Sequence, residues 1–360
     1  MAIVTVMRHM RLSSPNSKAT RLTRVIVLAL AVAGAVQYGI AQDIPLISGG
    51  IGFFTRTSGG DTNYQPYIEP VIAAPLGNHL LVESRATVLD TFFPKPGAGY
   101  SRANLFKTVD YLQADVLSGP HLTVVAGEFL TPFGTYNERL TQIWIQNFQD
   151  IPLIYGAGTM NTGSGVGGML RGSVVSTPDY SINYAAYYSA NVNSGYFGAE
   201  RSSGGQGAVY LPKKGLEIGA SYGRSLAGVH ENNVGVHLWW EPINSPFRFR
   251  SEYAHAPHAD GYWFETGYRL SRFGGADSLF GRLEPLFRMQ QTFRFKPDPN
   301  DGLPGINTQE ADFGLDYHLP HEVRINTSYA RQFSSGRDVN IWETALIYRF
   351  LFPMWKGKGK

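Results

Sequence analysis

Residues 342–352 read Trp-Glu-Thr-Ala-Leu-Ile-Tyr-Arg-Phe-Leu-Phe. Successive side chains of an extended chain point to opposite faces, so Glu343 and Arg349 share one face. The opposite face carries Trp342, Thr344, Leu346, Tyr348, Phe350 and Phe352. This alternation predicts a β-strand that is apolar on one side and charged on the other.

The same period of two recurs through the chain, and we count sixteen such segments between Ser48 and Phe352. In each clear case the polar face carries charged side chains, as expected for a surface in contact with water. The clearest further examples are residues 79–92, 232–241, 246–255 and 280–295. The chain is therefore predicted to be all-β.

The number of strands decides between a soluble sheet and a membrane barrel. The sequence offers no amphipathic helix and no second apolar face to cover sixteen half-apolar strands. In a bilayer, only a closed barrel satisfies all the backbone groups of such strands, with lipid outside and water inside. We therefore predict a transmembrane antiparallel up-and-down β-barrel of about 16 strands.

The connections between the segments alternate in length, which predicts the topology. Short turns fall at residues 75–78, 118–121, 177–179, 212–215, 242–246 and 319–321, with a longer one near 273–278. Longer connections fall near 58–63, 93–103, 131–164, 191–203, 226–231, 256–260, 296–306 and 334–338. Outer-membrane barrels have short periplasmic turns and long external loops, so both termini are predicted to be periplasmic.

The first 41 residues have the features of a secretory signal peptide. Five basic residues precede the apolar run Val25–Val36, and Gly39-Ile40-Ala41 supplies small residues for cleavage. An uncleaved anchor is the alternative, but a spanning helix needs about 20 apolar residues. The predicted organisation is a signal peptide at 1–41, a barrel at 42–352 and a short basic periplasmic tail at 353–360.

Charge and cysteine content exclude several classes of function. Five of the 31 Lys/Arg lie in the leader, which leaves 26 bases against 28 acids and gives no support for nucleic-acid binding. There is no cysteine, so disulfides and thiolate metal sites are excluded. Stability must come from the hydrogen-bonded sheet itself.

One connection, residues 131–164, is far longer than the others. Connections of more than about 12–15 residues are usually functional or disordered. The aromatic residues Phe133, Tyr136, Trp144, Phe148 and Tyr155 argue against disorder, because such side chains gain free energy by packing.

This topology resembles that of the Gram-negative sixteen-stranded porins, in which the third external loop follows the fifth strand and folds into the lumen. The stretch Gly127-Glu128-Phe129-Leu130-Thr131-Pro132-Phe133-Gly134 is also similar to the strand-to-loop passage of phosphate-selective-type porins. The resemblance implies an outer-membrane location, contact with lipid, a homotrimer and insertion by the barrel-insertion machinery. Pro353 and the residues after it depart from the family pattern of a terminal aromatic residue.

The resemblance also implies a pore constriction. Its candidate loop residues are Glu138, Arg139 and Asp150, and its candidate wall residues are Arg85, Arg171, Arg248, Arg250, Arg288 and Arg294. A ring of one sign in a narrow passage selects ions of the opposite sign. Acidic residues on the same faces nearly balance these arginines, so a preference for anions or for cations stays open.

The predicted function is passive diffusion of small hydrophilic solutes or ions through a pore narrowed by residues 131–164, with no cofactor, no metal and no catalytic residue. A substrate-specific channel and a barrel enzyme of phospholipase or protease type are the alternatives. The densest cluster of metal-ligand types, His255, His258 and Asp260, is interpreted as a solvated loop.

Overall fold

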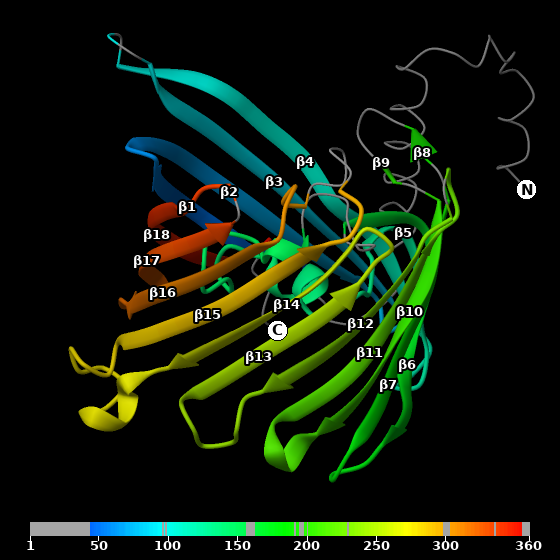
Figure 1. The fold of residues 1–360 in the computed structure, drawn as a ribbon. Coiled ribbons are helices and arrows are strands. Elements are labelled where there is room, and N and C mark those ends of the chain that lie inside the picture. The colour runs from blue at the N-terminus through cyan, green and yellow to red at the C-terminus, as the bar shows by residue number, and fades with distance from the viewer. Residues whose placement is uncertain are drawn as a thin grey trace, which may run out of the picture.

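The strands of the computed structural model form one closed barrel (Figure 1). The structure describes residues 44–354 except 96, 98, 156–162, 191, 194–197, 200, 229, 298–302 and 335. Within this part of the chain, sixteen antiparallel strands pair in sequence, and β1 (Leu46–Ser58) closes the ring by pairing with β18 (Val339–Pro353). The predicted fold is confirmed.

The other barrel strands are β2 (Asp61–Leu76), β3 (Leu80–Lys95), β4 (Gly99–Leu117), β5 (Thr123–Leu130), β6 (Ser164–Ser176), β7 (Ser181–Ala190), β10 (Ser202–Leu211), β11 (Leu216–Ser225), β12 (Asn232–Trp240), β13 (Phe247–His255), β14 (Ala259–Tyr268), β15 (Leu283–Arg294), β16 (Thr308–His318) and β17 (Val323–Ser334). Two short strands, β8 (Val192–Asn193) and β9 (Gly198–Ala199), pair with each other between β7 and β10. The helical turns are η2 (Tyr136–Leu140), η3 (Leu153–Tyr155), η4 (Pro212–Lys214) and η5 (Leu270–Phe273).

The distribution of polarity is the reverse of that in a soluble protein. Outward-facing side chains are apolar and exposed, as at Ile51 and Val236, whose exposed fractions are 46% and 53%. Inward-facing side chains are polar and buried, as at Arg288 and Gln290, which expose 2% and 0%. The alternation of the sequence therefore corresponds to the outer and inner faces of the barrel.

Three predicted long connections, near 58–63, 93–103 and 256–260, are in fact short hairpin turns, and only residues 256–258 separate β13 from β14. Only Gly59 and Gly60 separate β1 from β2, and both have positive φ (65° and 94°), which glycine adopts without steric penalty. The predicted loop at 93–103 lies mostly within β3 and β4, which extend beyond their neighbours (Figure 1). At the other end of the barrel, the turn near 273–278 belongs to a longer connection that contains η5.

The predicted signal peptide and most of the predicted basic tail lie outside the described residues, so both stay predictions. Across the described ranges, none of the helical segments has the length and apolarity that a membrane-crossing helix needs.

The outward face gives a test of the membrane environment. Val236 is central in β12 and faces outward, so Val236→Arg should lower the free energy of unfolding in phospholipid vesicles by about 2–4 kcal/mol. Urea titration followed by tryptophan fluorescence measures this change, with Val236→Leu as the control. In a water-soluble barrel the arginine would change stability by no more than about 0.5 kcal/mol.

Candidate functional site

The segment between β5 and β6 contacts inward-facing side chains of distant strands. Figure 1 shows its green helical turn inside the ring of strands. The backbone N–H of Ile143 donates to Glu69 of β2 (3.0 Å), and that of Leu153 donates to Gln290 of β15 (2.8 Å). We call residues 131–155 of this segment the inner loop.

The carboxylate of Glu252 on β13 is the main polar anchor of the inner loop. One of its oxygens accepts hydrogen bonds from the N–H and hydroxyl of Thr135 and from the N–H of Tyr136. The other accepts from the Tyr155 hydroxyl and, at 3.4 Å, from the Trp263 indole. Glu252 exposes only 2% of its surface, so a buried charge is stabilised by several donors at once.

Gly134 permits this close approach. Its φ is +64°, and a Cβ at this position would overlap the Tyr155 hydroxyl and the Glu252 carboxylate. Its N–H donates to Ser221 of β11 (3.0 Å), and its carbonyl accepts from Gln206 of β10 (2.6 Å). Glycine is therefore required here both for its conformation and for its lack of a side chain.

Two apolar clusters complete the attachment of the inner loop. Its base packs on β13 and β14 in a cluster formed by Phe133, Tyr136, Leu140, Ile154, Tyr155, Ala254, Ala256, Ala259 and Trp263. Its tip packs on β1 and β18, where Ile143 forms a buried cluster with Phe54, Ala345 and Ile347. The loop thus fills the side of the lumen next to β13–β18 and β1.

Polar wall residues hold the backbone between these clusters. Arg324 of β17 donates to the carbonyls of Ile143 (3.1 Å) and Gln146 (2.6 Å), and Asn326 donates to that of Asn147 (2.8 Å). On β15, Arg288 donates to the Asp150 carbonyl at 2.8 Å. These donors satisfy carbonyl groups of an irregular segment that the barrel wall shields from water.

A cavity of about 540 Å³ lies on the opposite side of the inner loop. Its wall comes from β3–β7 and β10, and the loop contributes Glu138, Arg139 and Gln142. The remaining lining residues are mainly polar: Glu83, Tyr111, Gln113, Thr123, Arg171, Ser173, Asn183, Tyr184 and Gln206. We call this space the passage cavity.

Three of the predicted constriction residues meet at the passage cavity. Glu138 and Arg139 reach it from the inner loop, and Arg171 reaches it from β6. Arg139 pairs with Glu217 at 2.8 Å, and Arg171 pairs with Asp115. Burial raises the pKa of the Glu138 carboxyl, an effect that the guanidinium groups of Arg171 and Arg139 oppose.

Three predicted wall arginines are buried in ion pairs instead. Arg85 pairs with Asp110 (3.0 Å) and donates to Thr141 of the inner loop (2.9 Å). Arg250 pairs with Glu241 at 3.0 Å and lies over the Trp239 ring. Arg288 pairs with Asp312 at 2.8 Å and lies over the ring of Phe148.

The remaining predicted residues also lie away from the passage cavity. Asp150 pairs with Arg56 of β1, and Arg248 pairs with Glu284 and donates to Asn147. Arg294 ends β15, where its backbone N–H donates to Asn307 (2.6 Å).

Several charged residues of the lumen were not predicted from the sequence. They form ion pairs with the inward-facing charges described above or with neighbours of those charges. They are Arg56 and the carboxylates of Glu69, Asp110, Asp115, Glu310, Asp312 and Asp316. The alternation of side chains along β16 could have identified its acidic residues, because Glu310, Asp312 and Asp316 share one face of the strand.

The cluster of His255, His258 and Asp260 does not share one set of contacts. His258 lies 2.6 Å from Glu231, whereas His255 lies 3.9 Å from Asp260. The two imidazole rings therefore face different carboxylates.

Comparison with known proteins gives structural matches alone, because neither a protein-family model nor a curated protein matches the chain. OmpF of Salmonella typhi, in complex with daunomycin, matches with a TM-score of 0.60 and 11% identity, over 85% of this chain and 97% of that chain. The in-vitro folded outer membrane protein OmpT of Vibrio cholerae matches with a TM-score of 0.53 and 10% identity, over 86% and 99%. An anion-selective porin from Comamonas acidovorans has a TM-score of 0.49 and 11% identity, over 85% and 98%. At these identities the first two matches show likeness of fold alone, and this agrees with the predicted closed barrel.

Removal of the Glu252 carboxylate tests the anchor. Glu252→Ala leaves donors of Thr135, Tyr136, Tyr155 and Trp263 without an acceptor, so the free energy of opening the inner loop should fall by about 3 kcal/mol or more. Amide hydrogen exchange at Thr135 and Tyr136 measures it. Asp260→Ala is the matched control, since that carboxylate binds Tyr253 on the neighbouring strand. Unchanged protection in Glu252→Ala would contradict the anchoring role.

Proposed function

We propose that the chain is an outer-membrane porin of a Gram-negative bacterium, through which small hydrophilic solutes or ions diffuse passively. The observation that carries this proposal is the passage cavity. It lies inside a closed barrel, is lined by polar side chains and is bordered by the inner loop on one side and the barrel wall on the other. A polar lumen within an apolar exterior suits a water-filled channel in a lipid bilayer.

The narrowing of the pore follows from how the inner loop is held. It packs against β13–β18 and β1, so solutes pass on the other side, next to β3–β7 and β10. Glu138, Arg139 and Arg171 are the charged groups that we propose at the constriction, together with Glu83. Charges of both signs at this point favour a general channel over one that strictly selects an ion of one sign.

The other predicted arginines have a different part in this proposal. Arg85, Arg248 and Arg288 each donate to the inner loop, so they hold it in position. The solute gradient drives transport, and the proposal includes no catalytic step, cofactor or metal. Assembly as a homotrimer and insertion by the barrel-insertion machinery belong to the proposal through the resemblance to porins.

The absence of cysteine allows a direct test of the passage. Ala185 on β7 lines the passage cavity, whereas the adjacent Ala186 is exposed on the outward face. In planar-bilayer recordings of Ala185→Cys, a charged, water-soluble methanethiosulfonate reagent should lower the single-channel conductance, because the added group occupies the passage.

The matched control is Ala186→Cys, in which the reagent should leave the conductance unchanged. Equal effects in the two variants would contradict the position of the passage. A refolded protein that shows no conductance at all would refute the channel. Lipase and protease assays of the same preparation address the enzyme alternative.

Charge reversal at the constriction tests its electrostatics. Arg171→Glu leaves Glu83 and Glu138 opposed by Arg139 alone, so the reversal potential in a KCl gradient should shift toward cation selectivity. Arg331→Glu is the control, because Arg331 is an exposed residue that pairs with Asp338 near the end of β17. An equal shift in both variants would argue against a constriction at Arg171.

A further inference from the structure

A second cavity, of about 510 Å³, lies next to the inner loop at the end of the barrel that carries the short turns. The inner loop contributes Trp144 and Ile145 to its lining, and the turn between β16 and β17 contributes His321 and Glu322. Its charged lining is mainly basic, with Arg248, Arg269, Arg324 and Arg349 facing the single carboxylate of Glu322. We call this space the basic vestibule.

The arginines of the basic vestibule differ in how fully they are paired. Arg248 pairs with Glu284, and Arg324 pairs with Asp316 at 3.1 Å and also holds the inner loop. Arg349 is only loosely paired, at 3.8 Å from Glu322. Arg269 donates its Nε to the Gly281 carbonyl (3.2 Å), and no carboxylate of the described residues pairs with it. Arg269 and Arg349 therefore keep donors for an anion.

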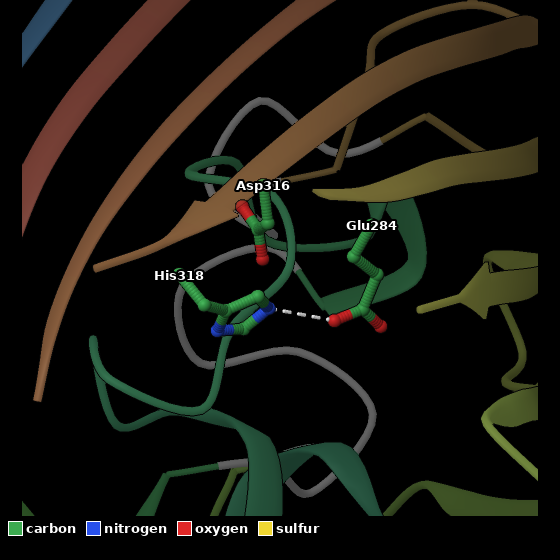
Figure 2. Close-up of side chains that lie close together, drawn as sticks. All are labelled: Glu284, Asp316 and His318. Carbon is green, nitrogen blue, oxygen red and sulfur yellow. Dashed lines mark hydrogen bonds and ion pairs between the residues drawn. The ribbon is translucent and has the colours of Figure 1, made fainter. Parts of the chain in front are cut away.

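The cluster of Glu284, Asp316 and His318 beside the vestibule supports this arrangement (Figure 2). His318 from β16 points its ring at the Glu284 carboxylate on β15, with Nε2 2.8 Å from the oxygen. These residue types suit a metal ion, but Arg248 and Arg324 already contact the two carboxylates. A cation here would face two guanidinium groups, so the cluster serves to orient arginines that line the vestibule.

The turn between β16 and β17, beside the vestibule, has two consecutive non-glycine residues in a left-handed backbone conformation. His321 and Glu322 both have positive φ (61° and 60°), as in the hairpin turns that favour asparagine and glycine. Neither residue is of a type that the turn itself prefers. Their side chains are both part of the vestibule lining.

We propose that the basic vestibule binds small organic carboxylates with an apolar body. A carboxylate matches the planar fork of an arginine, and the indole of Trp144 with Ile145 and Ile347 offers an apolar surface for the rest of the molecule. This inference rests on the proposed channel and deepens it, because it names anionic solutes as a class that the short-turn mouth would bind.

The test uses the refolded full chain in zwitterionic detergent and 4-fluorobenzoate as the probe. The ¹⁹F resonance of 4-fluorobenzoate should broaden on binding, and the broadening should saturate. The resonance of the neutral 4-fluorobenzyl alcohol should not broaden. Arg269→Gln should weaken the affinity about tenfold, because a charge-assisted hydrogen bond is lost. Arg349→Gln, at an exposed site, should also weaken it and provides a second variant if Arg269→Gln does not fold.

Arg282→Gln is the matched control, since Arg282 lies in the same β14–β15 connection and outside the vestibule lining. Equal broadening by acid and alcohol, or unchanged affinity in both vestibule variants, would overturn the proposal. Binding in micelles does not require conduction. A protein that binds 4-fluorobenzoate but does not conduct would refute the channel alone, whereas one that conducts without binding would refute only the vestibule site.

Discussion

The rest of the lumen depends on the contact between the Glu252 carboxylate and the inner loop. A single buried carboxylate accepts hydrogen bonds from Thr135, Tyr136, Tyr155 and Trp263, and so fixes both the first turn of the loop and its return. A buried charge is tolerated only where donors replace its lost hydration. Here the donors belong mostly to the loop, so the stability of the charge and the position of the loop depend on each other.

The position of the loop determines where the lumen stays open. Because the apolar clusters lie against β13–β14 and against β1 and β18, the loop covers one side of the barrel. Among the described residues, one cavity lies beside β3–β7 and β10, and another lies between the loop and the short turns. The same packing that satisfies the aromatic residues of the loop thus separates a mixed-charge passage from a mainly basic vestibule.

Strand parity predicted the barrel because lipid and water impose a period of two on every strand. Glu252 and Arg288 were assigned correctly to the inward face by this rule. Their partners could not be predicted, because ion pairs such as Arg288 with Asp312 depend on the register between strands. The connection at Gly59-Gly60 was predicted to be long because the residues on both sides of it are polar. In the structure these residues continue the two strands up to the turn.

For the same reason, the sequence could not predict which of the lumenal arginines form the candidate site. Parity assigns an arginine to the lumen but gives neither its height along the barrel nor its distance from the loop. Arg171 reaches the passage cavity, while Arg85, also inward-facing, donates to Thr141 of the inner loop. A guanidinium that holds carbonyls or carboxylates in place has few donors left for a solute. In the proposed vestibule, the arginines that contact an anion are therefore those, such as Arg269, whose local partners leave hydrogen-bonding capacity unused.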